Sequence, residues 1–208
     1  MNMCCGPLKS EDRRYSDSIA KSWENLSNRD LAELSELSGG AVDGRRLKLK
    51  ILADTIILDF DSKRIFWEDG INAEQDLQVV LLHYLIRAEG KIDGKWISYR
   101  DIEGGNLYYS VFQGRALRPL VATFGEEPEK LLKAGLQLGG VMAQRGDASV
   151  DLRFFPFAQV NVTVWKGDDE VPSNANILFD SATGRMLPAE DLAHLSADLV
   201  HALIAASK

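Results

Sequence analysis

The order of apolar and polar residues predicts helices at both ends and in the middle of the chain, with two groups of strands between them. The strongest helical pattern runs from Asn72 to Gly90, where apolar residues recur every three or four positions on two stripes. A narrow polar strip on this helix carries Asp76, His83 and Arg87. We expect Asn72 to cap its N-terminus, Gly90 to end it, and the helix to be buried on more than one side.

Two regions alternate apolar and polar residues with the period of two that is typical of strands. Between Arg45 and Trp67, the segments RLKLKIL, TIILDF and RIFW predict a three-stranded antiparallel meander. Further along, SVDLRFF, AQVNVTVW and NILFD predict a second strand group, with a turn over residues 181–184. The segment WISYRDI, after an Asp93-Gly94 turn, is expected to be a short extended piece.

Further helices are expected around these strands, and together the elements indicate an α+β fold. Helices are predicted over residues 16–26, from a cap at Asn28 to Gly39, over 106–125 with an interruption at Pro119, from Pro128, and from Pro188 to about residue 205. The order predicts two antiparallel strand groups around a buried central helix, with a C-terminal amphipathic helix. No linker divides the chain, so we expect a disordered tail over 1–12 and one domain over 13–208.

Composition narrows the class of protein. The 208 residues carry a net charge of −7, which disfavours a general nucleic-acid surface or an anionic-membrane surface. The first residues lack the apolar stretch of a signal peptide, so we expect a cytoplasmic protein; its oligomeric state is left open. Cys4 and Cys5 are too few for a complete zinc or iron–sulfur site, and the sequence leaves open whether they bind a metal.

Two groups of charged residues have spacings that metal sites use. Asp168, Asp169 and Glu170 follow a strand end, and a turn can bring neighbouring carboxylates together around a hard cation. The alternative for them is a solvated or capping turn. On the last helix, Asp191, His194, Asp198 and His201 share a stripe; it could bind a metal or form weak surface pairs.

A third group of residues suits an anionic ligand with aromatic walls. Arginine offers a planar fork to carboxylates, and histidine can ligate a metal centre or act as a general base. Internal salt bridges and a hydrogen-bonded core histidine are the alternatives for these residues. No nucleophile elbow, P-loop or HExxH motif is present. The candidate cofactor-binding residues are therefore His83, Trp96, Tyr99, Arg100, Arg115 and Trp165.

Several short motifs occur in the order found in one known family. They include HYL at 83–85, WISYRDI at 96–102, FQGR at 112–115, WKGDDE at 165–170 and ILFD at 177–180. Over more than half of its length the chain resembles the domain-of-unknown-function family three-seven-eight-six. The resemblance implies an uncharacterised protein of anaerobic bacteria or archaea, some of whose relatives are fused to an iron–sulfur module of the corrinoid type. This chain lacks the four-cysteine segment of that module.

Three functional hypotheses follow. The leading one is a non-enzymatic binding or accessory protein for a carboxylated cofactor or small metabolite, held between the central helix and one sheet. The resemblance alone suggests a corrinoid or other tetrapyrrole, with His83 as axial ligand; the cofactor itself is unknown. The first alternative is a metal-dependent hydrolase or lyase that uses Asp168, Glu170 and His83. The second is a protein-interaction module, which predicts a large exposed apolar patch instead of a pocket.

Overall fold

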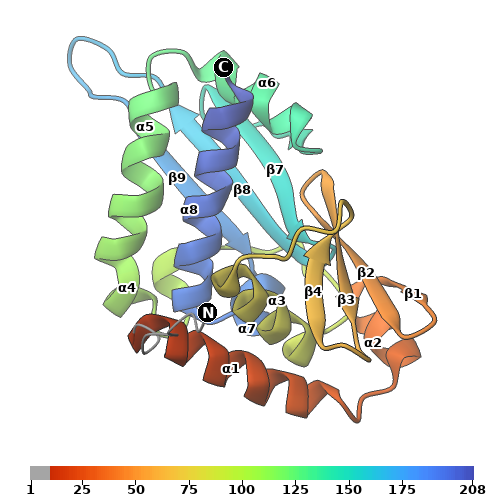
Figure 1. Ribbon diagram of the computed structural model, residues 1–208. Helices are drawn as coiled ribbons and strands as arrows, with labels where there is room; N and C mark the ends of the chain where they lie inside the picture. Colours follow the sequence, from red (N-terminus) through yellow and green to blue (C-terminus); the bar gives the residue numbers. More distant parts are fainter. Residues whose placement is uncertain (1–9) are drawn as a thin grey trace, which may run out of the picture.

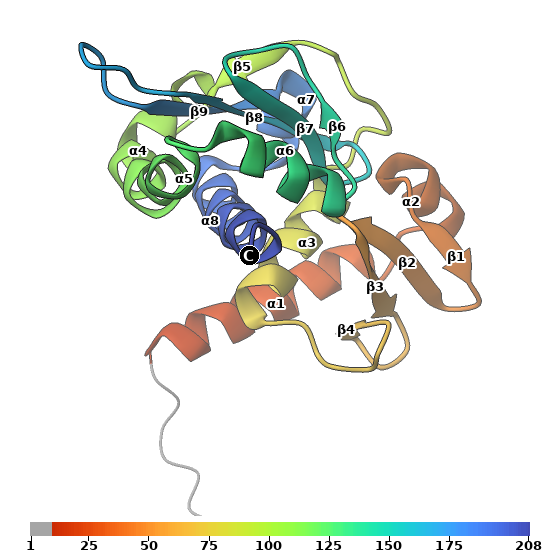
Figure 2. The same ribbon diagram turned by 90° about the horizontal axis from the view of Figure 1, so that it is seen from above.

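The computed structural model describes residues 10–208, with side chains from Tyr15 onward, and contains two antiparallel sheets. The first sheet has the order β1-β2-β3-β4 (Figure 1) and the second the order β5-β9-β8-β7-β6 (Figure 2). The strands of the first are Ala41–Asp43, Arg46–Ile51, Asp54–Asp59 and Arg64–Trp67. In chain order, β5 to β9 are Trp96–Ser98, Val141–Met142, Ala148–Phe155, Ala158–Trp165 and Asn174–Asp180.

Helices connect and cover these sheets. Four of them precede the π-helical turn of residues 113–117: α1 (Ser10–Leu26), α2 (Leu31–Ser38), α3 (Gln75–Arg87) and α4 (Gly105–Phe112). Four follow it: α5 (Arg118–Phe124), α6 (Pro128–Gln137), α7 (Ser181–Met186) and α8 (Ala189–Ala206). The 3-10 turn Tyr99–Asp101 lies between β5 and α4. None of the helices in residues 10–208 is both long and apolar enough to cross a membrane.

The helices are arranged in a layer against the second sheet and a bridge to the first. Figure 2 shows α4, α5, α6 and α8 on the same face of the second sheet, while α3 lies between α8 and the first sheet, with α1 along it. At one point the β2–β3 turn is tied to the second sheet, because the Leu52 N–H donates to the carbonyl of Arg153 in β7 at 3.2 Å. The α+β class, the two strand groups and the C-terminal helix are therefore confirmed.

The central helix α3 is buried on several sides, as its pattern predicts. Val80, Leu81, Leu82 and Leu85 are all buried although they point in different directions around the helix axis. Tyr84 ties the helix to two other segments. Its hydroxyl donates to the Ser38 carbonyl at 2.8 Å and accepts from the Phe157 N–H at 3.2 Å.

Both predicted ends of this helix were wrong. Asn72 forms a β-bridge with Phe66 and accepts a hydrogen bond from Arg64, so it belongs to the sheet and the cap position is Glu74. The helix ends before Gly90, whose N–H donates to the Leu37 carbonyl. A similar shift occurs at α2, where Asp30 and not Asn28 is the cap. At α3 a nearby hydrogen-bond partner holds Asn72 and Gly90 outside the helix, whereas at α2 the Asp30 carboxylate caps the helix by accepting from the Ala32 N–H.

The residues predicted as a turn at 181–184 form the helix α7 instead. The reason is Asp180, the last residue of β9, whose fully buried carboxylate accepts from the Ala182 N–H at 2.9 Å and caps the helix. The same carboxylate accepts from the N–H groups of Asp93 and Gly94 at 3.0 and 2.7 Å. One side chain therefore ends a strand, starts a helix and fixes the predicted Asp93-Gly94 turn.

The interruption expected at Pro119 takes the form of the π-helical turn just before it. Proline has no N–H and its ring clashes with the carbonyl four residues earlier in an α-helix. The wider turn lets the Arg118 N–H donate to the Gln113 carbonyl, five residues back. Helical backbone thus continues from Gly105 to Phe124 without a break.

Candidate functional site

The structure gives His83 a carboxylate partner that lies 108 residues away in the sequence. His83 Nδ1 is 2.7 Å from Asp191 Oδ2, so the bond joins α3 to the first turn of α8. The Asp191 side chain is 9% exposed and that of His83 is 30% exposed. The carboxylate is therefore buried, while part of the imidazole remains open to solvent.

The position of Asp191 in α8 suits an ionised carboxylate. It lies in the first turn, where backbone N–H groups have no partner inside the helix and the helix dipole favours negative charge. A carboxylate only accepts hydrogen bonds, so His83 Nδ1 carries the proton of this pair. The other ring nitrogen, Nε2, has no hydrogen-bond partner within the described part of the chain.

The His83–Asp191 pair lies at a cavity of about 390 Å³ between α1, α3 and α8. This cavity is called the helical cavity below. It has an apolar side, formed by Val79 and Val80, and a polar side with three carboxylates and two imidazoles. Its lining residues are Tyr15, Ser18, Asp76, Val79, Val80, His83, Glu190, Asp191 and His194.

Negative charge prevails around the helical cavity. Glu190 accepts a hydrogen bond from the Tyr108 hydroxyl at 3.2 Å, and its charge raises the pKa of that tyrosine. Asp198 lies one turn beyond His194, at the surface of α8. Partial loss of solvation raises the pKa of Asp198, and the charge of Asp76 raises it further. His194 and His201 act in the opposite direction.

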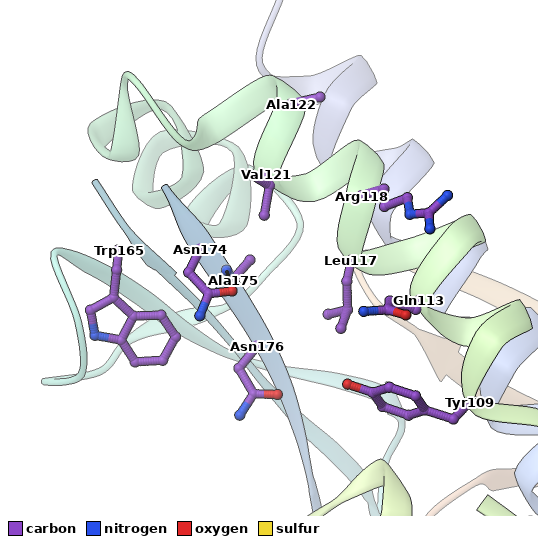
Figure 3. Close-up of a pocket in the computed structure, with 10 residues that line it drawn as sticks. All are labelled: Tyr109, Gln113, Leu117, Arg118, Val121, Ala122, Trp165, Asn174, Ala175 and Asn176. Atoms are coloured by element: carbon purple, nitrogen blue, oxygen red, sulfur yellow. Dashed lines mark hydrogen bonds between the residues drawn. The ribbon is translucent and has the colours of Figure 1, made fainter. Parts of the chain in front are cut away.

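A second cavity, of about 570 Å³, lies between the α4–α5 helix and the edge of β9 (Figure 3). This one is called the edge cavity. In Figure 3 the Tyr109 hydroxyl and the Gln113 amide extend from the helix toward the cavity, and Trp165 and Asn176 lie opposite on the sheet. Its lining residues are Tyr109, Gln113, Leu117, Arg118, Val121, Ala122, Trp165, Asn174, Ala175 and Asn176.

The edge cavity exists because β5 covers only part of β9. β5 pairs with residues 178–180 alone, whereas β9 begins at Asn174 and pairs along its other side with β8. Residues 174–177 therefore have no strand partner on the side of β5 within the described chain. The α4–α5 helix crosses beside this open edge, and the space between them remains unfilled.

The residues predicted to bind one cofactor are divided among several places. His83 lines the helical cavity and Trp165 the edge cavity, which share no lining residue. The Arg100 guanidinium lies over the Tyr109 ring, 3.9 Å from its centroid, and so stands behind one wall of the edge cavity. Arg115 is exposed and lines neither cavity.

Two predicted aromatic residues are engaged inside the protein. Tyr99 is buried, stacks on Phe112 with ring centroids 4.1 Å apart, and donates its hydroxyl to the Ala189 carbonyl at 2.6 Å. The Arg145 guanidinium lies over the Trp96 ring, 5.3 Å from the ring centroid. Tyr99 is therefore part of the core, and Trp96 lines neither cavity.

The acidic turn at 168–170 is exposed, and one of its carboxylates is engaged by backbone. Asp168 Oδ1 accepts from the N–H groups of Glu170 and Val171 at 2.9 and 2.7 Å, and these bonds lower the pKa of Asp168. Asp169 lies beside it, also exposed. Among the residues that the structure describes, no three or more His, Cys, Asp or Glu side chains converge well enough to hold a metal ion. Cys4 and Cys5 lie outside those residues.

Sequence reasoning singled out His83 and Asp191 separately and did not pair them. The available signal was that each lies on the polar strip of an otherwise apolar helix, which places both at a helix–helix boundary. The lining of the edge cavity was missed almost entirely: Tyr109, Asn174 and Asn176 belong to no motif, and Gln113 lies in the FQGR motif without having been singled out as a site residue. These residues come together only because the α4–α5 helix lies beside the uncovered edge of β9.

The chain matches one family of known sequences. The family described as Domain of unknown function (DUF3786) matches residues 30–202. This range includes all lining residues of the edge cavity, and those of the helical cavity except the two from α1. No curated protein and no solved structure shows significant similarity to the chain. The match covers most of the sequence and all the strands described above, and the protein is therefore a member of the DUF3786 family.

Proposed function

We propose that this protein binds a small metabolite in the edge cavity, and that the ligand is a planar, uncharged heterocycle of the nucleobase or pterin kind. The observation that carries the proposal is the convergence of unpaired amide and hydroxyl groups between two aromatic rings (Figure 3). A volume of about 570 Å³ is within the usual range for small-molecule sites.

The polar groups of the edge cavity are available to a ligand. The Tyr109 hydroxyl and the Gln113 and Asn176 amides line the cavity and have no hydrogen-bond partner in residues 15–208. Asn174 Oδ1 accepts from the Ala175 N–H, which leaves its Nδ2 free to donate. Each amide offers a donor beside an acceptor, the pattern that matches the edge of a nucleobase or a pterin.

The aromatic groups supply the planar component of recognition. The Trp165 side chain is 39% exposed at the end of β8, a costly position for an indole unless something covers it. Tyr109 stands across the cavity with Arg100 against its ring, so the guanidinium holds the phenol plane in place. Stacking on aromatic rings is tolerant of ligand identity and contributes about 1–3 kcal/mol per base in nucleic-acid sites.

The charge of the cavity favours a neutral ligand over the carboxylated one expected from sequence. Arg118 is the one charged residue in the lining, and in Figure 3 its guanidinium extends away from the cavity. His83, the expected axial ligand of a tetrapyrrole, lines the other cavity. A tetrapyrrole in the edge cavity would therefore have to bind without His83 as a ligand.

Fluorescence and calorimetric titration of the purified protein test this proposal. The probes are guanosine, adenosine, biopterin and, as an aliphatic control of similar polarity, glucose. We expect at least one heterocycle to bind and to change tryptophan emission, and Trp165→Ala to weaken its affinity about tenfold by loss of stacking. Gln113→Ala and Asn176→Ala should each weaken it through a lost hydrogen bond.

The matched control is Leu107→Ala on the same helix, since Leu107 is 82% exposed and lines neither cavity. Its affinity should equal that of the wild type. Binding of none of the heterocycles, or equal binding by wild type and Trp165→Ala, would exclude the edge cavity as the site.

A further inference from the structure

We propose that His83 is a general base that activates water for the hydrolysis of an uncharged or cationic carboxylic ester bound in the helical cavity. This activity goes beyond the binding function, because the two cavities have no lining residue in common. It needs no metal ion. The chemistry is assigned to the chain's own imidazole and carboxylate.

The geometry of the pair is that of an oriented base. The buried Asp191 carboxylate holds Nδ1 at 2.7 Å and fixes the plane and tautomer of the ring. Nε2, without a partner in the described residues, is left with a lone pair, and the ring itself lines the cavity. A surface ion pair would leave both partners mobile in water, whereas this carboxylate is held inside the α3–α8 contact.

The reaction follows from this arrangement and is balanced without another reactant. Water in the helical cavity transfers a proton to Nε2 as its oxygen bonds to the ester carbonyl carbon. The tetrahedral intermediate then collapses, the bond to the alcohol oxygen breaks, and Nε2 returns the proton to the leaving alcohol. The sum is ester plus water giving acid plus alcohol, and Asp191 stabilises the imidazolium that forms between the two steps.

The charges around the cavity decide the substrate class. Asp76 from α3 and Glu190 from α8 add two carboxylates to that of Asp191, while only His83 and His194 in the lining can become cationic. These carboxylates would repel an anionic ester, and they would not repel a neutral or cationic one. The remaining titratable group in the lining is Tyr15 of α1, and Val79 and Val80 offer an apolar surface to the acyl chain.

Three 4-nitrophenyl esters test the proposal: the neutral acetate, a trimethylammonium-bearing ester and the anionic hemisuccinate. We expect the first two to be hydrolysed faster than the third. His83→Gln should lower kcat/KM about a hundredfold, a typical contribution of a general base. The matched control is His201→Gln, an exposed histidine on α8 outside the cavity, which should leave the rate unchanged. Equal losses in both variants, or wild-type rates no higher than those of His83→Gln, would overturn the proposal.

Asp191 is assigned as a positioning residue, and rescue by a conservative variant distinguishes this from a purely structural role. In Asp191→Asn the imidazole loses the carboxylate that orients it, so kcat should fall while KM changes little. Asp191→Glu, which keeps a carboxylate at this position, should recover part of the rate. Equal losses of rate in the two variants would remove Asp191 from the proposed mechanism.

Chemical modification gives a test that needs no variant to fold. Diethyl pyrocarbonate acylates accessible neutral imidazoles, and the chain has three histidines, so peptide mass spectrometry can follow each one. We expect carbethoxylation of His83 to track the loss of hydrolysis, and hydroxylamine to restore both. Hydrolysis that persists with His83 modified would contradict the proposed role.

Discussion

At the scale of single residues, this protein uses a few side chains to join segments that are far apart in the sequence. Arg185 of α7 is one example. Its guanidinium donates from Nη2 to Glu89 Oε2 and from Nη1 to Asp93 Oδ2, at 2.6 Å each, and from Nε to Glu89 Oε1 at 3.1 Å. The segment between α3 and β5 is thereby held against α7. A planar fork that meets one carboxylate with two bonds is the strongest form of such a contact.

This clamp predicts a pH-dependent contribution to stability. The Arg185 hydrogen bonds lower the pKa of Glu89 and, together with a bond from Ser181, hold the pKa of Asp93 at about 2. A carboxylate with a lowered folded-state pKa stabilises the fold above its unfolded pKa of about 4, and that gain is lost as the pH falls toward 2. Arg185→Met should therefore melt below the wild type at pH 7, with the difference shrinking toward zero at pH 2.

Thermal unfolding between pH 7 and pH 2 measures this difference. The control is Arg115→Met, another exposed arginine, which has no ion pair among residues 15–208 and whose melting temperature should parallel the wild type throughout. A gap between Arg185→Met and wild type that stays constant down to pH 2 would mean that the clamp acts through packing and not through charge.

At the scale of elements, close contact between helix and sheet depends on a glycine in α6. A Cβ at Gly135 would lie 2.8 Å from both γ-methyl groups of Val150, a fully buried residue of β7. Glycine in a helix costs stability, so its presence here reflects the space between α6 and β7. The π-turn glycine Gly114 provides the opposite case, since a Cβ there meets nothing within 4 Å.

The two glycines should respond to alanine in opposite directions. Gly135→Ala should destabilise the protein by about 1–2 kcal/mol, because overpacking against branched Val150 exceeds the gain in helix propensity. Gly114→Ala should be neutral or stabilise by up to about 1 kcal/mol. Urea unfolding of both variants measures these free energies. Stabilisation by Gly135→Ala would show that the α6–β7 contact adapts more easily than its geometry suggests.

At the scale of the whole molecule, α3 connects the parts that carry the two sheets. Tyr84 is fully buried, stacks on Phe155 with centroids 4.6 Å apart, and hydrogen-bonds to α2 and to the turn between β7 and β8. Burial also raises the pKa of this tyrosine, so its hydroxyl remains protonated and able to donate. One side chain thus links the second sheet to the α2–α3 region beside the first.

We therefore expect the described chain to unfold in one cooperative transition. Far-ultraviolet circular dichroism and tryptophan fluorescence should change together in urea, since Trp67 reports on the first sheet and Trp165 on the second. Tyr84→Phe should lower the free energy of unfolding by about 1–2 kcal/mol by leaving the Ser38 carbonyl and Phe157 N–H without a partner. Its control is Tyr108→Phe, whose bond to Glu190 is exposed. Two separate transitions in the wild type would show two independent domains.

Periodicity alone was sufficient for the main elements. The alternation in RLKLKIL and AQVNVTVW and the leucines of the last helix each encode one buried face, and the corresponding strands and helix are present. The short strands β1 and β6 were not predicted, because two or three exposed residues carry no period. The helix α7 was missed because its cap comes from a buried aspartate that also binds a distant turn.

The sequence by itself determined the α+β class, the buried central helix and the presence of His83 on its polar strip. Only the tertiary structure decided which residues share a site. It placed Asp191 on His83 across 108 residues, moved Trp165 to a different cavity, and left part of the β9 edge uncovered beside Tyr109. The physical reason is that burial of an apolar face depends on local periodicity, whereas a pair of polar groups depends on how two elements pack, and no local pattern encodes that packing.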